Sequence, residues 1–344
     1  MKKILTFFVI LLCSNSIYSQ LFVNEIDSDT DSFDELEFLE IKSESPNFSL
    51  NGYIVVFFNG SSSGADSSYL TLDLNGFQTD LNGLFLIGNI NVSPSAQLII
   101  PNSSIQNGAD AVAIYEASVD DFPDSTLATT VNLIDALVYD TSDSDDDNLM
   151  ALLGLNSQIN ENENGNKTTE SIQRANDGSY FITLPTPREV NEGNGVSLNG
   201  IDFSFNQESY YEGEQIEINF TTEEAVEEPI TIFFTLDYEN FDSTDYSDIE
   251  SVTFESGQNS VMLTIDIIDD DIDEGDEDFV LSLSINDENY LLLNNNSIVR
   301  VNDNDFIVAN YGTPIEPTYS EISNDFPDNY YSNLNGLSGQ DLIV

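Results

Sequence analysis

Short apolar runs, separated by Gly, Asn, Ser and Pro, follow one another through the first 190 residues. Runs of this length, divided by turn residues at regular intervals, are typical of an all-β sandwich. One helical segment is expected at 148–155, and the polar, Asn-rich segment 156–166 is expected to be an exposed loop. The predicted strands are 21–26, 36–41, 53–58, 69–74, 84–87, 97–100, 111–115 and 134–139.

The second part of the chain repeats this pattern after a Gly/Asn-rich stretch at 193–200, which we interpret as a linker. We therefore predict an all-β protein of two consecutive antiparallel, immunoglobulin-like β-sandwich domains, at 20–192 and 201–305. The segment 306–344 is broken by Pro and Gly, and we predict a short irregular tail there. The strands expected in the second domain are 216–220, 230–236, 251–254, 261–268, 279–285 and 297–301.

The first 19 residues have the pattern of a secretory signal peptide. Lys2 and Lys3 precede an apolar stretch at 4–13, which is too short to span a bilayer, and polar residues follow up to Ser19. Cleavage is expected between Ser19 and Gln20. Because no later segment is long and apolar enough to form a transmembrane anchor, we expect a secreted or extracellular protein, with attachment to the cell surface as a variant of this location.

Charge and missing residue types exclude many functions. The chain carries 63 acidic and 7 basic residues, a net charge of −56, so phosphate backbones are repelled and no direct nucleic-acid binding is expected. It contains no His, and its one Cys lies at position 13 within the leader. Ser-His-Asp and Cys-His catalysis, His-ligated zinc and disulfides are thereby excluded. We expect no catalytic residues within the 344 residues.

The most acidic stretch, 267–279, connects two predicted strands and holds eight carboxylates without a Lys or Arg. Such a cluster repels itself, and a hard divalent cation with a preference for oxygen ligands relieves the repulsion. A solvated acidic loop is the alternative. Further acids lie at other predicted strand ends: Glu212, Asp245, Asp303 and Asp305.

These acids belong to a set of motifs by which residues 201–305 resemble a Calx-beta domain. The motifs occur in the family's order: Glu-Gly at 212–213, Asp-Tyr at 245–246, Phe-Glu-Ser-Gly at 254–257, the acidic block 269–279 and Asp-Asn-Asp at 303–305. The resemblance implies a seven-stranded antiparallel sandwich that binds Ca²⁺ at one end. Asn304 stands where some members have a third acid, which leaves the number of ions open. The implied ligands are Glu212, Asp245, Asp269, Asp270, Glu274, Glu277, Asp303 and Asp305.

Residues 20–192 are similar to secreted bacterial lamin-tail domains. The resemblance is carried by Val-Asn-Glu-Ile at 23–26, Glu-Phe-Leu-Glu-Ile at 37–41, Leu-Asn-Gly-Tyr at 50–53 and Thr-Pro-Arg at 186–188. Segments 83–89, 107–115, 134–139 and 171–174 fit the later strands. Such domains are accessory modules without catalytic residues, and the protein or glycan surface that this one would bind stays open.

Acids in the first domain allow a weaker metal hypothesis. The Asp-x-Asp-x-Asp segment at 27–31 imitates the start of an EF-hand loop, but Ser32 and Phe38 occupy the positions that need Gly and Glu. The segment 143–147 fails in the same way. We predict solvated loops at both places, with weak cation binding as the alternative. Glu25, Glu37 and Glu40 alternate with apolar residues, and we expect them to point outward from half-buried strands.

The segment 328–342 resembles the opening of an endonuclease I-type nuclease domain, whose His base and Mg²⁺ ligands would lie beyond residue 344. Two main hypotheses result. The first is a secreted, non-catalytic, calcium-binding β-module protein for adhesion or extracellular interaction. The second is the N-terminal accessory region of an extracellular nuclease whose catalytic domain is missing from this chain. A hydrolase that uses an Asp/Glu pair is a third hypothesis, and no catalytic motif supports it.

Overall fold

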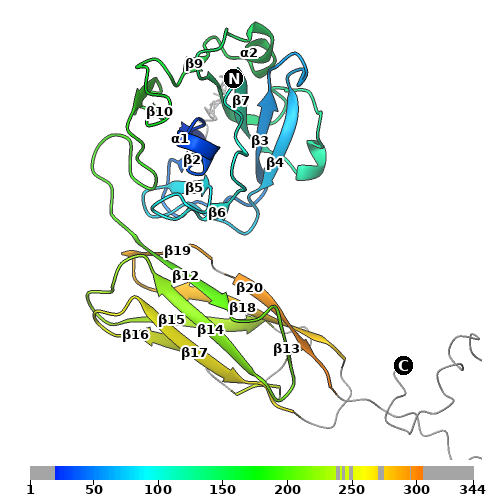
Figure 1. Cartoon of the computed structure of the whole chain (residues 1–344), viewed down its shortest axis with the longest axis vertical. Coiled ribbons are helices and arrows are strands. Elements are labelled where there is room, and N and C mark those ends of the chain that lie inside the picture. Colours follow the sequence, from blue (N-terminus) through cyan, green and yellow to red (C-terminus); the bar gives the residue numbers. More distant parts are fainter. Residues whose placement is uncertain are drawn as a thin grey trace, which may run out of the picture. The chain divides into compact units, whose positions relative to one another are not determined.

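The computed structural model describes residues 20–237, 241, 245–247, 251–269, 275–294 and 296–304. These residues form strands with a few short helices, and they divide into two compact units (Figure 1). Among the described residues the first unit runs to residue 200, and the second comprises 201–286 and 294–304; residues 290–292 pair with a sheet of the second unit and are described with it. The all-β prediction is confirmed.

Two sheets pack face to face in the first unit. The six-stranded sheet has the order β11-β10-β1-β2-β5-β6, and the five-stranded sheet has the order β4-β3-β7-β8-β9. Neighbours are antiparallel except for the short pairs β5/β6 and β8/β9, which are parallel. The bounds are β1 (Leu21–Asp27), β2 (Phe38–Ser43), β3 (Tyr53–Asn59), β4 (Ser67–Asp73), β5 (Leu84–Gly88), β6 (Leu98–Ile99), β7 (Asp110–Glu116), β8 (Leu133–Asp140), β9 (Ile159–Asn160), β10 (Ser171–Arg174) and β11 (Tyr180–Thr183).

Apolar side chains fill the space between these sheets and also cover their outer faces. The central cluster contains Ile26 and Leu39 from the first sheet and Phe57 and Ile114 from the second. Because the outer faces are covered as well, strands such as β3 are apolar on both sides, and this explains their continuous apolar sequence.

A short helix, α2 (Asp147–Leu153), covers the outer face of the five-stranded sheet. Asp146 caps it by accepting hydrogen bonds from the backbone N–H groups of Asn148 and Leu149. The helix ends at Gly154, whose φ of 72° is in the left-handed region that glycine adopts without strain. The predicted helix is therefore confirmed. The other helical turns are α1 (Asp31–Asp34) and η1 (Val119–Asp121).

The second unit is again built from two sheets. Their strand orders are β17-β14-β12-β19 and β13-β20-β18-β15-β16. Along β14 exposed or half-buried residues alternate with buried ones, as expected for a strand with one face on a core. The bounds are β12 (Asn199–Phe205), β13 (Ser209–Tyr211), β14 (Gln215–Thr222), β15 (Ile230–Asp237), β16 (Ser251–Phe254), β17 (Ser260–Asp266), β18 (Glu277–Ile285), β19 (Tyr290–Leu292) and β20 (Asn296–Asn302).

The expectation of seven antiparallel strands in this unit is wrong in two details. Short strand β13 extends the five-stranded sheet and short strand β19 extends the four-stranded sheet, and β13 pairs with β20 in parallel. Three-residue strands of this kind carry too little periodicity to be recognised in the sequence. The apolar core contains Phe203 packed on Phe220, with ring centroids 5.8 Å apart, and Phe241 against Phe279 at 5.5 Å.

No helix in the described part of the chain is long and apolar enough to cross a membrane. The predicted leader (1–19) and tail (306–344) lie outside the described residues.

Candidate metal site at one end of the second unit

Parallel pairing of β13 and β20 brings two predicted ligands to the same edge. Strand β13 runs beside β20 (Figure 1), and Tyr211 is paired with Asn302. Glu212 and Asp303, which follow these strands, therefore begin side by side. The backbone N–H of Glu212 donates to the carbonyl of Asn302 at 3.3 Å. The Asn302 side chain donates to the carbonyl of Tyr210 at 2.9 Å and ties the two strand ends together.

Asn304 connects this edge to the segment after β17. Its side-chain amide donates to Asp269 Oδ1 at 3.0 Å and to the carbonyl oxygen of Glu212 at 3.3 Å. Gly213 lies close beside Asp269: a Cβ at this glycine would be 3.2 Å from the Asp269 Cβ, and its φ is +78°. The Glu-Gly motif therefore lets the Glu212 loop approach Asp269 without a side chain between them.

Asp245 and Glu277 complete the described part of the set. The N–H of Ile268 donates to the carbonyl of Asp245 at 2.8 Å, and Tyr246 forms a bridge with Ile267. Asp245 is thereby held next to Ile268, the residue before Asp269. Glu277 is the first residue of β18, and just before it Gly275 N–H donates to Asp303 Oδ2 at 2.7 Å.

The structure thus brings together the loops that carry Glu212, Asp245, Asp269, Glu277 and Asp303. The other three predicted ligands, Asp270, Glu274 and Asp305, lie outside the described residues. Within the ranges that are described, no three Asp or Glu side chains stand close enough together to hold a metal ion. The side-chain atoms that these loops offer as metal ligands are all oxygens, and such a set suits Ca²⁺ and not the softer transition metals.

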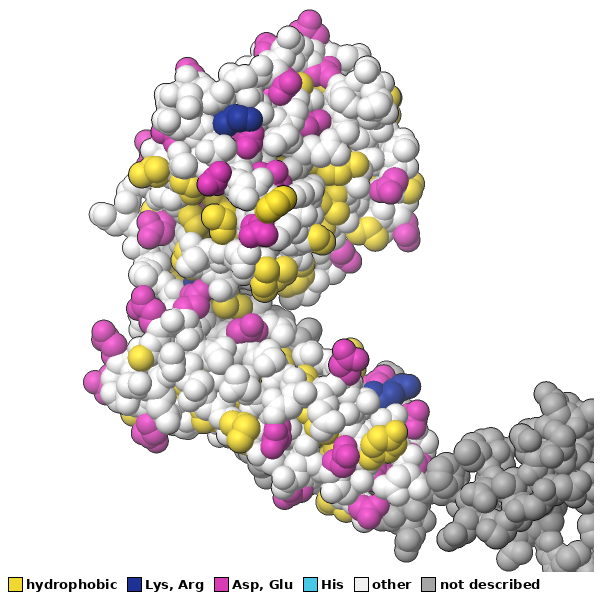
Figure 2. All heavy atoms as spheres, viewed as in Figure 1, with side chains coloured by type: hydrophobic (Ala, Val, Ile, Leu, Met, Phe, Trp, Pro, Cys, Tyr) yellow, Lys and Arg dark blue, Asp and Glu magenta, His cyan; other side chains and the backbone are white. Residues whose placement is uncertain are grey.

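The charge around these loops is strongly negative. Figure 2 shows acidic side chains over the visible face of both units and very few basic ones. Arg300 on β20 contacts Asp278 at 3.1 Å and Asp276 at 4.0 Å, and all three side chains are about half exposed. Exposed pairs of this kind contribute little stability, so they do not offset the repulsion among the carboxylates at this end.

The sequence did not predict that the first unit would bury so many carboxylates. Glu25, Glu37 and Glu40 are 0 % exposed, so the prediction that they point outward is wrong. The prediction of a solvated loop at 27–31 is also wrong, because Asp27 and Asp29 are buried. Residues 143–145, in contrast, are exposed as predicted.

Hydrogen bonds from distant segments explain how two of these acids are tolerated. Glu25 accepts from Ser171 Oγ at 2.6 Å and from Thr186 N–H and Oγ at 2.8 and 2.7 Å. Glu40 accepts from the Asn24 amide and the Arg188 N–H, both at 2.7 Å. Burial raises the pKa of both carboxyl groups, and these hydrogen bonds oppose the rise.

Comparison with known proteins addresses the second unit. Residues 195–305 match the family model of the Calx-beta domain. The solved structures that match include the apo form of the Calx CBD1 domain, which is 22 % identical in sequence. The match covers 30 % of this chain and 98 % of that domain, with a TM-score of 0.27. The CBD12 structure from CALX1.2 has 21 % identity, covers 30 % of this chain and 46 % of its own, and has a TM-score of 0.26. No curated protein matches the chain. The family model thus identifies residues 195–305 as a Calx-beta domain.

Proposed function

We propose that the Calx-beta domain binds Ca²⁺ and that the chain acts as a secreted, non-catalytic module in adhesion or another extracellular interaction. The observation that carries the proposal is the meeting of the Glu212, Asp269 and Asp303 loops at one end of the domain, linked by Asn304. The ligands would be Glu212, Asp245, Asp269, Asp270, Glu274, Glu277, Asp303 and Asp305.

In this proposal Ca²⁺ acts by joining loops that repel one another. Its coordination sphere of six to eight oxygens is adaptable, and it can accept carboxylates from several loops at once. An ion bound only by the folded domain adds RT ln(1 + [L]/Kd) to the stability, about 2.7 kcal/mol at a hundredfold excess over Kd. The bound domain would then be a stiffer support for whatever the chain contacts.

The first unit would supply the contact surface in this proposal. Its lamin-tail-like sequence implies an accessory role, and the predicted leader implies export. The partner would be a protein or glycan surface that tolerates a strongly acidic molecule, because the net charge of −56 repels phosphate-rich partners. Attachment to a cell surface would be through such a partner.

The test of calcium binding is a titration of purified residues 20–344 with Ca²⁺ and with Mg²⁺ by calorimetry. We expect saturable binding of Ca²⁺, and the part of it due to the Calx-beta domain should be lost or weakened at least tenfold in Asp303→Asn and in Glu277→Gln. Glu255→Gln is a matched control, since Glu255 is exposed in the turn between β16 and β17. Equal heats for both cations in all four proteins would show only screening of a negative surface.

The second candidate function, the accessory region of an extracellular nuclease, rests on the resemblance of residues 328–342. Reading the genomic DNA beyond codon 344 separates the two. An in-frame continuation with His, Arg and Asn favours the nuclease, and a stop codon favours the module. Under either proposal, residues 20–344 alone should leave a supercoiled plasmid intact, because the chain has no His base and repels phosphate.

A further inference from the structure

Two buried carboxylates lie at adjacent strand ends of the first unit. Asp27 is the last residue of β1, and its cross-strand partner is Phe38, so Glu37 lies one position before that pair. Asp27 is 4 % exposed and Glu37 is 0 % exposed. Both are removed from water, where their charges would otherwise be solvated.

One oxygen of each carboxylate accepts no hydrogen bond: Asp27 Oδ1 and Glu37 Oε1. Glu37 uses its other oxygen, which accepts from the N–H groups of Ser104 at 2.9 Å and Ile105 at 3.3 Å. Glu25, equally buried on the same strand as Asp27, accepts four hydrogen bonds in the same unit. A buried oxygen without a donor requires an explanation, and a bound ion is one.

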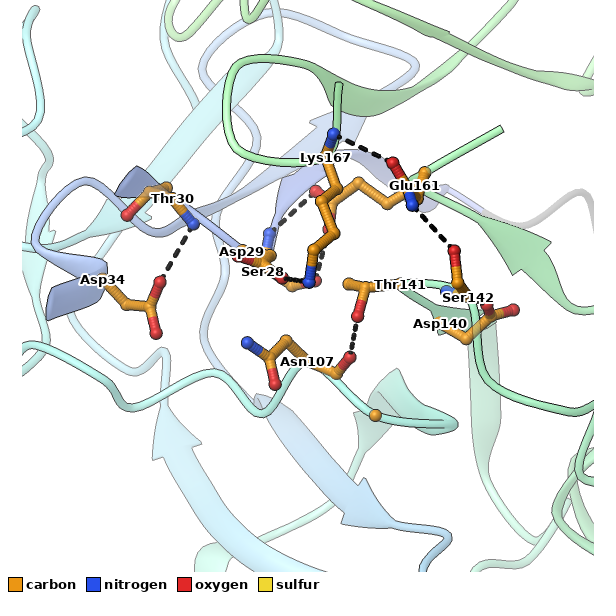
Figure 3. Close-up of polar contacts among 12 residues, drawn as sticks. Ser28, Asp29, Thr30, Asp34, Asn107, Asp140, Thr141, Ser142, Glu161 and Lys167 are labelled. Carbon is orange, nitrogen blue, oxygen red and sulfur yellow. Dashed lines mark hydrogen bonds and ion pairs between the residues drawn. The ribbon is translucent and has the colours of Figure 1, made fainter. Parts of the chain in front are cut away.

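More carboxylates than cations surround these two oxygens. Burial raises the pKa of Asp27 well above its usual range, and Glu161, Glu25, Asp29 and Glu37 add to the rise in that order. The two oxygens of Glu161 accept from the N–H and hydroxyl of Ser28 (Figure 3). Lys167 forms an ion pair with Asp29, as Figure 3 also shows. This one ammonium group faces several carboxylates.

A polar cavity of about 570 Å³ lies next to the segment that donates hydrogen bonds to Glu37. Ile105 lines the cavity, and its N–H is one of the two donors to Glu37, so Glu37 contacts a residue of the cavity wall. The lining includes the acids and amides Asp34, Asn59, Gln106, Asn107, Asp110 and Asp143, and no Lys or Arg. A cation is thus attracted to this wall.

We propose that the first unit binds a Ca²⁺ ion of its own through Asp27 and Glu37, and that the ion enters from this cavity. Since no three carboxylates converge among the residues that the structure describes, water and backbone or hydroxyl oxygens would complete the coordination sphere, as Ca²⁺ permits. The proposal uses no residue of the Calx-beta domain and is independent of the function proposed for it. A proton on Asp27 is the competing explanation.

Hydrogen exchange followed by mass spectrometry distinguishes these explanations on residues 20–344. It should be measured at pH 8 in EDTA, in 1 mM Ca²⁺ and in 1 mM Mg²⁺. We expect Ca²⁺ to slow exchange at least threefold in peptides that cover 20–43 and 100–110, and Mg²⁺ to have a smaller effect. The double variant Asp27→Asn with Glu37→Gln should lose this protection, and Asp145→Asn, an exposed acid of the same unit, should keep it.

Unchanged exchange in these peptides of the wild-type chain, or protection that persists in the double variant, overturns the proposal. The wild-type comparison needs no substitution, so it decides even if the double variant does not fold. Peptides that cover 209–215 and 296–304 report separately on the Calx-beta domain. Protection there without protection at 20–43 contradicts only the first-unit site, and the reverse pattern contradicts only the proposed function.

Discussion

The side-chain amide of Asn304 donates to Asp269 Oδ1 at 3.0 Å, where an acid would place two carboxylates in contact. We predict that Asn304→Asp lowers the melting temperature in EDTA by a few degrees, because like charges at this distance repel. It should also increase the stabilisation by Ca²⁺, since the ion gains a ligand. Thermal unfolding in EDTA and in Ca²⁺ measures both effects.

Asn289→Asp is the control for this variant. Asn289 also donates its side-chain amide to an aspartate, Asp287, at 2.9 Å, but in the turn between β18 and β19. This change should destabilise the protein in EDTA without enlarging the effect of Ca²⁺. If the two variants respond to Ca²⁺ alike, Asn304 is not at an ion site.

We predict a large loss of stability when the side chain of Glu25 is truncated. Glu25→Ala leaves the hydroxyl of buried Ser171 and the N–H and hydroxyl of half-buried Thr186 without their acceptor, and we expect a loss of about 3 kcal/mol or more in the free energy of unfolding. Glu25→Gln keeps an acceptor and should cost about half as much. Urea unfolding measures both, and a loss below about 0.5 kcal/mol for Glu25→Ala would contradict the role of Glu25 as a structural anchor.

The first unit should become less stable as the pH rises from about 4.5 to about 8. Burial is the main cause that raises the pKa of Glu37 from 4.5 to about 7 and that of Glu161 from 4.5 to about 8. Between these values the folded state holds protons that the unfolded chain has released, so the stability due to these groups is present below pH 4.5 and lost as pH passes the raised pKa values. Thermal unfolding in EDTA at pH 5.5 and 8.5 measures the fall.

Glu161→Gln should flatten this pH dependence, because the amide does not titrate. Asp145→Asn removes one exposed charge and should leave the slope almost unchanged, so it separates burial from the general repulsion of an acidic chain. A melting temperature that rises with pH, or equal slopes in both variants, would contradict the assignment to Glu161.

Strand positions could be predicted from the sequence because apolar runs and turn residues alternate regularly, as at β3 and β7. Which face of a strand is covered could not be predicted. Glu25 and Glu40 alternate with apolar residues in the way that outward-facing residues do, yet both are buried. Their partners, Thr186 and Arg188, lie some 150 positions away, and nothing local in the sequence indicates this contact.

The sequence predicted more about which loops form the candidate site than about how the strands around it pair. The motifs at 212–213 and 303–305 indicated loops that meet, and the structure brings Glu212 and Asp303 together through β13 and β20. The parallel pairing itself could not be foreseen, because β13 has only three residues. The hydrogen-bond geometry of Asn304 also depends on side-chain positions that no spacing rule gives.

The most direct test of the central claim is the effect of Ca²⁺ on the unfolding of residues 20–344, with hydrogen exchange to locate it. Ca²⁺ should raise the transition temperature of the Calx-beta domain well beyond the effect of equal Mg²⁺ or of NaCl at matched ionic strength. The double change of Glu274 and Glu277 to Gln should remove most of that difference. If Ca²⁺, Mg²⁺ and NaCl raise the transition equally, the carboxylates form no calcium site and the account is contradicted.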